Sequence, residues 1–124
     1  MSEELQGVVV CHGKLARALI EAAESISGVT GALTPVSNAD CDRGSLEQRV
    51  LEAVDSRPTL VFVDMASGSC LFAVLNRLRT ASGVKVVTGV NLAMLVDFVF
   101  HRSVSPEEAA ARAATAGERA IRVP

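Results

Sequence analysis

The sequence has no tryptophan, no tyrosine and only four phenylalanines among its 124 residues. Proteins that bind single-stranded nucleic acids stack bases on aromatic side chains, and flavin sites commonly sandwich the ring between such side chains. The shortage of aromatics therefore argues against both kinds of site. The net charge of −2 also argues against a protein that binds nucleic acid through bulk positive charge.

Long hydrophobic runs and paired cysteines are missing as well. The apolar runs are far shorter than the roughly 20 residues needed to cross a bilayer. The first residues, MSEELQ, lack the basic start and apolar stretch of a secretory signal, so we expect a cytoplasmic protein. Three cysteines do not make a disulfide framework, and we interpret Cys11, Cys41 and Cys70 as small buried or half-buried thiols. Neither glycine-rich nucleotide motif, GxxxxGK[ST] or GxGxxG, occurs.

The chain is rich in apolar residues, which make up 49% of it, and its length suits one domain spanning residues 1–124. Continuous apolar runs predict strands at 7–11 and 60–64, and another strand is predicted at 84–88. A further strand is predicted within 29–36, at a sheet edge, because Gly31 and Pro35 interrupt it. Helical periodicity lies between the strands. This alternation predicts an α/β fold: a doubly wound, mainly parallel four-stranded sheet of order 2-1-3-4 with helices on both faces.

The helical segments carry their own start and stop signals. The first predicted helix begins near Lys14, ends at Gly28 and buries one apolar stripe. That stripe comprises Leu15, Leu19, Ala22, Ala23 and Ile26. Ser45 and Gln48 have the spacing of a capping box, as do Ser105 and Glu108 before the last, alanine-rich helix. Asn91 is predicted to cap a short helix before it.

Two polar residues follow the predicted central strands. His12 comes after the first strand and Asp64 ends the third, so the order 2-1-3-4 places them together at the switch point of the sheet. A carboxylate that accepts a hydrogen bond from one ring nitrogen fixes the tautomer and leaves the other nitrogen as a nucleophile. The segment Ser67–Ser69 opens a helix, where backbone N–H groups suit an anion such as a phosphoryl group. Thr88, at the end of the fourth strand, can add a hydroxyl.

Other interpretations remain open for these residues. His12 can be a surface polar residue at a strand end, and Asp64 can simply cap a loop. A metal site could in principle draw on Cys11, His12, Asp64 and Cys70. We disfavour it, because adjacent residues of a strand point to opposite sides and no CxxC or HxxxH spacing occurs. We interpret the second histidine, His101, as a solvated cation at a helix end.

Three segments resemble the enzyme IIA domains of the mannose family (mannose/fructose/sorbose class) of the bacterial sugar phosphotransferase system. They are Gly7–Ala16 (GVVVCHGKLA), Leu60–Met65 followed by Ser67–Ser69, and Val87–Leu95 (VTGVNLAML). The resemblance implies a phosphotransferase in which His12 is transiently phosphorylated, with Asp64 beside it. It also implies that Ser69 faces the phosphoryl group. From their places at the helix start and the strand end, we expect Ser67, Gly68 and Thr88 to bind that group as well.

The resemblance further implies the partners. The phosphoryl group would come from the histidine-containing phosphocarrier protein and leave to a IIB-type domain and then to sugar. No cofactor and no metal would be needed, and the membrane would be reached only through a transporter complex. A homo-oligomer is also expected.

The chain departs from the family pattern beside the site. The family's Phe-Gly-Gly-Ser-Pro is here Ala66–Cys70, and its proline in the third segment is Ala93. A phosphotransfer subunit of dihydroxyacetone kinase shares the same histidine position. The alternative function is therefore a regulatory or interaction domain of the same fold, including a role like that subunit's.

Overall fold

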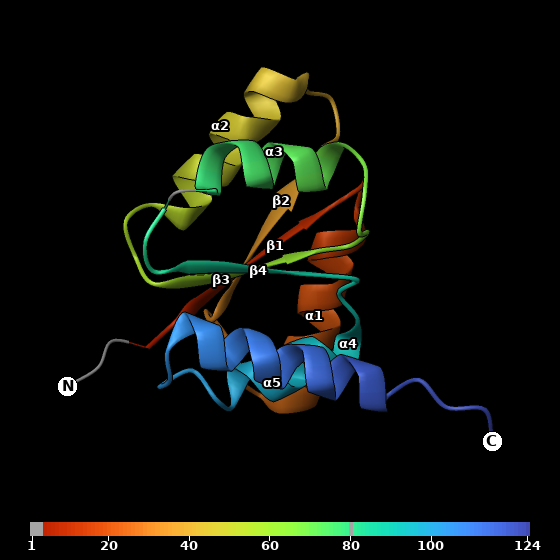
Figure 1. Cartoon of the computed structure of the whole chain (residues 1–124). Helices are drawn as coiled ribbons and strands as arrows, with labels where there is room; N and C mark the ends of the chain where they lie inside the picture. Colours follow the sequence, from red (N-terminus) through yellow and green to blue (C-terminus); the bar gives the residue numbers. More distant parts are fainter. Residues whose placement is uncertain (1–3, 80) are drawn as a thin grey trace.

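A computed structural model describes residues 4–79 and 81–124. Its elements are β1 (Gln6–Cys11), α1 (Leu15–Ser27), β2 (Leu33–Ser37), α2 (Arg43–Val54), β3 (Thr59–Val63), α3 (Ser69–Leu78), β4 (Val84–Thr88), α4 (Leu92–Val99) and α5 (Pro106–Arg119). Figure 1 shows the sheet between two layers of helices. The four strands are all parallel and lie in the order β2-β1-β3-β4, which confirms the predicted topology.

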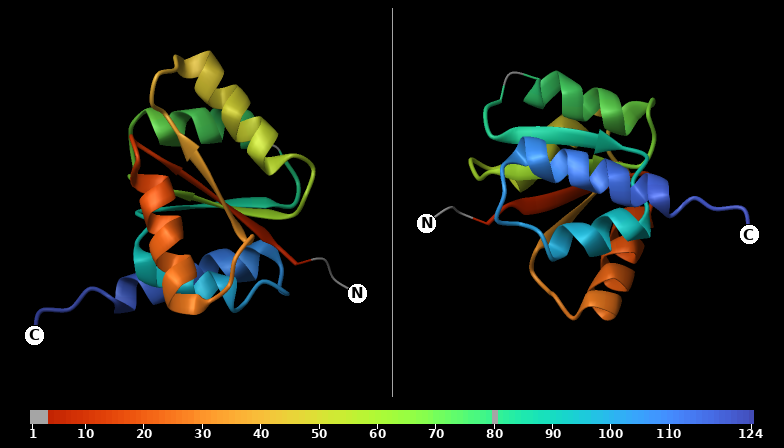
Figure 2. Two further views of the ribbon diagram at one scale, coloured as in Figure 1. Left: turned by 180° about the vertical axis from the view of Figure 1, so that it is seen from behind. Right: turned by 60° about the horizontal axis from the view of Figure 1, so that its bottom comes forward.

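The two helical layers cover opposite faces of the sheet. Helices α2 and α3 lie on one face, and α1, α4 and α5 lie on the other (Figures 1 and 2). Alternate residues of β1 therefore enter different cores: Val8 and Val10 pack under α2 and α3, whereas Val9 and Cys11 pack against the other three helices. Because both faces are buried, the inner strands are continuous apolar runs.

The buried face of α1 differs from the predicted stripe. Ala16, Ile20 and Ala23 are the buried residues, while Leu15 and Ile26 are 44% and 62% exposed. Apolar residues occupy adjacent pairs along this helix, so its apolar surface is wider than the sheet can cover. Contact with α4 as well as with the sheet decides which edge of that surface is buried.

Two element boundaries also differ from expectation. Helix α2 starts earlier than the Ser45 capping box, because Asp42 is its N-cap and accepts a hydrogen bond from the Ser45 N–H at 2.8 Å. Strand β2 begins only at Leu33, although it is an edge strand as predicted. The Asn91 cap, the Gly28 stop and the Ser105 cap before Pro106 are confirmed.

Parallel pairing brings the carboxyl ends of all four strands to one edge of the sheet. Val10 of β1 is paired with Val63 of β3, so the chain leaves the two neighbouring strands at the same level. Asp64 follows Val63 directly, and His12 comes two residues after Val10. Within residues 4–79 and 81–124, no helix has the length and apolar character needed to span a membrane.

Candidate functional site

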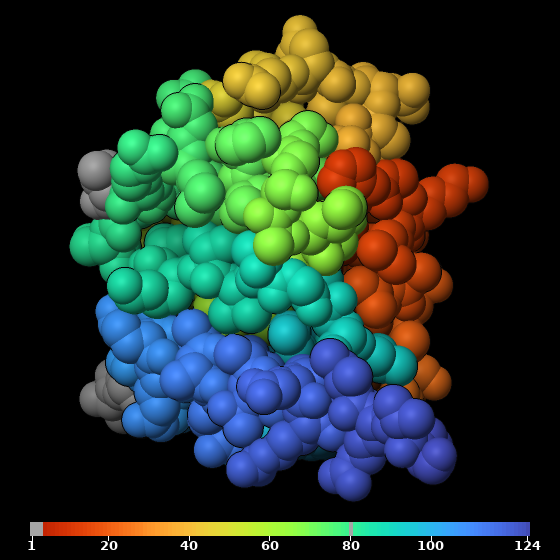
Figure 3. Space-filling view, turned by 45° about the vertical axis from the view of Figure 1, so that its right-hand side comes forward, coloured from red at the N-terminus to blue at the C-terminus, as the bar shows by residue number. Residues whose placement is uncertain are grey.

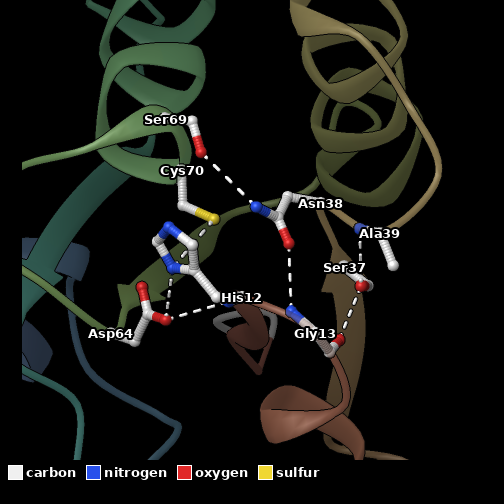
Figure 4. Close-up of polar contacts among 8 residues, drawn as sticks. All are labelled: His12, Gly13, Ser37, Asn38, Ala39, Asp64, Ser69 and Cys70. Atoms are coloured by element: carbon white, nitrogen blue, oxygen red, sulfur yellow. Dashed lines mark hydrogen bonds and ion pairs between the residues drawn. The ribbon is translucent and has the colours of Figure 1, made fainter.

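His12 and Asp64 form the centre of the site, as the sequence predicts. Asp64 Oδ2 accepts the His12 backbone N–H at 2.9 Å and lies 2.8 Å from His12 Nδ1 (Figure 4). The Asp64 side chain is only 8% exposed, whereas the His12 side chain is 42% exposed. One carboxylate oxygen therefore holds both the backbone and the ring of His12, while the ring itself reaches solvent.

This contact decides which ring nitrogen is available. A carboxylate only accepts hydrogen bonds, so the neutral imidazole carries its proton on Nδ1 and donates it to Asp64. Nε2 then keeps its lone pair, and it points away from Asp64 (Figure 4). The arrangement suits nucleophilic attack by Nε2, with the carboxylate stabilising the positive charge that the ring acquires.

The segment that follows β3 lies directly over the ring. Gly68 has φ +99° and is the N-cap of α3, and a Cβ placed on it would be 3.8 Å from both His12 Cε1 and Nε2. Backbone N–H groups in the first turn of a helix are without intrahelical partners, and they attract anions. Figure 3 shows the yellow-green segment after β3 packed against the red segment after β1 at the surface. Ser67 and Ser69 are exposed in this segment.

A residue missed by the sequence analysis links the two loops beside His12. Asn38, at the end of β2, accepts the Gly13 N–H through Oδ1 at 3.0 Å and contacts Ser69 Oγ through Nδ2 at 3.5 Å (Figure 4). Ser37 Oγ donates to the Gly13 carbonyl at 2.6 Å. No local signal marks Asn38, because its partners are distant in the sequence.

Two thiols lie close to the site. Cys70 Sγ lies 3.7 Å from His12 Nδ1, and Cys11 is buried on the opposite side of β1. Burial, with the Asp64 carboxylate as a second cause, raises the pKa of the Cys70 thiol to about 11. The same two causes, in the same order, raise the pKa of Cys11 to about 12. Both shifts favour the protonated thiol at neutral pH.

Within the described residues, three side chains lie close enough together to share a metal ion, one fewer than the four considered from the sequence. His12, Asp64 and Cys70 each offer a donor atom, and these atoms lie within 4.8 Å of one another. Cys11 is outside this group, as expected from alternation along β1. The other carboxylate oxygen, Asp64 Oδ1, is buried and has no hydrogen-bond partner among the described residues.

Thr88 and His101 lie apart from these contacts. Thr88 ends β4 beside Val63, and its hydroxyl takes no part in the hydrogen bonds that hold His12 and Asp64. His101 follows α4, where its Nδ1 lies 2.8 Å from the Asp97 carbonyl and 3.4 Å from the Asp97 carboxylate. The structure thus unites His12, Asp64 and the segment at Gly68, and it leaves Thr88 at the edge of the site.

The chain matches one family model and several solved structures. A family model described as "PTS system fructose IIA component" matches residues 6–115. A phosphotransferase system component EIIA from Streptococcus agalactiae is 20% identical with a TM-score of 0.88, and the match covers 96% of each chain. No match is found among curated proteins.

Two structures from Enterococcus faecalis are also similar. A mannose/sorbose-specific IIA subunit of the phosphotransferase system is 22% identical with a TM-score of 0.82, over 98% of this chain and 96% of that one. A protein described as a sigma-54 interaction domain protein is 16% identical with a TM-score of 0.77, over the same shares. At these identities the structures establish a common fold.

Proposed function

The chain belongs to the family of phosphotransferase system IIA components of the fructose and mannose type, and on that premise we propose that it is a phosphocarrier that uses His12. It accepts a phosphoryl group from the histidine-containing phosphocarrier protein and passes it to a IIB-type domain. The observation that carries the proposal is the 2.8 Å contact between His12 Nδ1 and Asp64, which leaves Nε2 unprotonated and accessible.

The proposed transfer needs no other reactant. The Nε2 lone pair attacks phosphorus, a new N–P bond forms, and the bond from phosphorus to the donor's ring nitrogen breaks. The donor ring leaves with that electron pair and becomes a neutral imidazole. The Nδ1 proton of His12 stays on the ring, which is now cationic, and Asp64 stabilises it. Positioning and electrostatics supply most of the catalysis in such a reaction.

The segment over the ring is proposed to bind the phosphoryl oxygens. Ser67, Gly68 and Ser69 lie at the positive end of α3, and the absence of a side chain at Gly68 leaves space beside Nε2. Thr88 is a further proposed contact, reached from the neighbouring strand end.

The wider setting is part of the same proposal. We expect one domain over residues 1–124, a cytoplasmic location where the phosphocarrier donor works, and contact with a membrane only through a transporter. A homo-oligomer is also expected. Sedimentation equilibrium tests this expectation.

A regulatory role is the second candidate. The segment Ala66–Cys70 departs from the family pattern at the border of the site, where a partner protein would dock. A similar fold occurs in the protein described as a sigma-54 interaction domain protein. In this alternative His12 is phosphorylated by the same donor, but a regulator, or a partner like that of the dihydroxyacetone kinase subunit, takes the place of the IIB domain.

The test is the intact mass after incubation with phosphoenolpyruvate, enzyme I and the phosphocarrier protein. We expect a gain of one phosphoryl group, about 80 Da, that is labile to acid. The chain has two histidines, so His12→Ala and His101→Ala form a matched pair. Loss of the added mass only in His12→Ala supports the proposal, whereas an unmodified wild-type protein, or modification that survives in His12→Ala, contradicts it.

A further inference from the structure

Nδ1 of His12, a carboxylate oxygen of Asp64 and Sγ of Cys70 form a cluster of three donor atoms, and the proposed phosphoryl transfer does not use the thiol. We propose that His12, Asp64 and Cys70 bind a zinc ion, and that the bound ion prevents phosphorylation of His12. Binding of the ion is independent of the function proposed above. The block on phosphorylation rests on the proposed function.

The separations fit a single ion. His12 Nδ1 lies 2.8 Å from Asp64 Oδ2 and 3.7 Å from Cys70 Sγ, and donor atoms of the three residues lie within 4.8 Å of one another. Tetrahedral zinc with ligands at about 2.0–2.3 Å separates neighbouring donors by roughly 3.5 Å. Small side-chain rotations therefore suffice to place all three donors around one ion, and the fourth position stays open.

Asp64 provides an independent sign of a ligand. Its Oδ1 is buried and has no partner among the described residues, and its side chain is only 8% exposed. A buried carboxylate oxygen without a hydrogen bond is costly, and a cation satisfies it. The His12 side chain beside it is 42% exposed, so the cluster lies close to the protein surface.

The donor set selects the class of metal. Thiolate and imidazole are ligands for zinc and similar soft or borderline ions, whereas magnesium and calcium prefer oxygen. When the Cys70 thiol gives up its proton to solvent, the thiolate and the Asp64 carboxylate together balance the charge of the divalent ion. Coordination by the ion stabilises the thiolate directly.

Coordination and phosphorylation compete for the same ring. A neutral imidazole has one N–H. When zinc takes the Nδ1 lone pair, the ring proton moves from Nδ1 to Nε2, and Nε2 no longer has a free electron pair. The ion also breaks the hydrogen bond from Nδ1 to Asp64. Zinc-bound His12 therefore cannot attack phosphorus.

The first arm of the test uses the metal alone. Cobalt(II) is added to the purified full-length chain, and the thiolate-to-cobalt charge-transfer absorption is recorded. We expect this band in the wild type and in Cys41→Ala, a control that removes another cysteine, and we expect its loss in Cys70→Ala. Zinc affinity measured by calorimetry should fall at least about 100-fold in Cys70→Ala. Absence of the band in the wild type, or its persistence in Cys70→Ala, overturns the site.

The second arm measures phosphorylation of the zinc-loaded and the zinc-free protein. Excess zinc is removed before the donor proteins are added. Wild type and Cys41→Ala should lose phosphorylation with zinc and regain it with a chelator. Cys70→Ala should be equally active under both conditions. Normal phosphorylation of zinc-loaded wild type overturns the competition. Failure of the zinc-free protein to be phosphorylated overturns the proposed function instead, and the cobalt spectrum still decides the metal site.

Discussion

Replacing Asp64 by asparagine removes the negative charge of the carboxylate and keeps the shape of the side chain. Asp64 Oδ2 accepts two hydrogen bonds from His12, at 2.9 Å from the backbone nitrogen and 2.8 Å from Nδ1. An asparagine oxygen can occupy the same position and accept both. What disappears is the negative charge that faces the ring when it becomes cationic during transfer.

The expected loss follows from this one contact. A net hydrogen bond that involves a charged group contributes about 1.5–3 kcal/mol, and most of that contribution arises only as the ring gains charge. Transfer should therefore slow by roughly 10- to 150-fold. The fold should survive, because Asp64 Oδ1 already lacks a hydrogen-bond partner among the described residues, and the asparagine NH2 that replaces it is similarly unsatisfied.

The assay is single-turnover transfer from the phosphorylated donor, followed by rapid quenching. Asp97→Asn is the control, because it removes a carboxylate that contacts the other histidine, at 3.4 Å from His101 Nδ1. Circular dichroism checks that both variants are folded. A wild-type rate for Asp64→Asn, or equal slowing by Asp97→Asn, would refute the reasoning.

Three further predictions concern stability. Gly7→Ala places a Cβ 2.6 Å from Leu33 Cδ2 and 2.8 Å from Phe98 Cε2, so overpacking should cost about 1–3 kcal/mol and lower the melting temperature by about 4–12 °C; an unchanged melting curve would contradict this. Gly68→Ala should cost about 1–3 kcal/mol in urea unfolding, because its φ of +99° strains any side-chain-bearing residue. Hydrogen bonds from the Ser45 amide and side chain lower the pKa of Asp42, so its stabilising effect is present above the ordinary value of 3.8 and disappears as the pH falls through the lowered pKa. Acid melts should therefore decline more steeply for the wild type than for Asp42→Asn, and parallel curves would argue against the cap.

The strands and their order were predictable from the sequence for a simple reason. A parallel strand covered on both faces must be largely apolar, so the inner strands β1 and β3 are visible as runs of valine, leucine and phenylalanine. The edge strand β4 (VKVVT) is visible from its three valines, although Lys85 in it is exposed. The centre of the site was predictable for the same reason, because polar residues directly after such runs lie at one edge of the sheet. His12 and Asp64 needed no further information.

The remaining features depend on contacts that no local pattern specifies. In α1, adjacent apolar pairs such as Leu15 and Ala16 allow two possible buried faces, and packing against α4 selects one of them. In the sequence, Asn38 is one of several polar residues in a loop. Only the folded structure brings Gly13 and Ser69 into contact with it. The closeness of Cys70 to the ring likewise depends on how α3 starts above the strand ends.

In the proposed phosphotransfer function, the shared acceptor oxygen of Asp64 separates chemistry from partner choice. Because Oδ2 contacts both the backbone N–H and the ring of His12, it fixes the orientation of the imidazole. The exposed residues Met65, Ala66 and Ser67 follow Asp64 at the surface, where a partner protein would contact them. Under that proposal, mutations of these three residues would change which partner accepts the phosphoryl group while the orientation of the His12 ring stays the same.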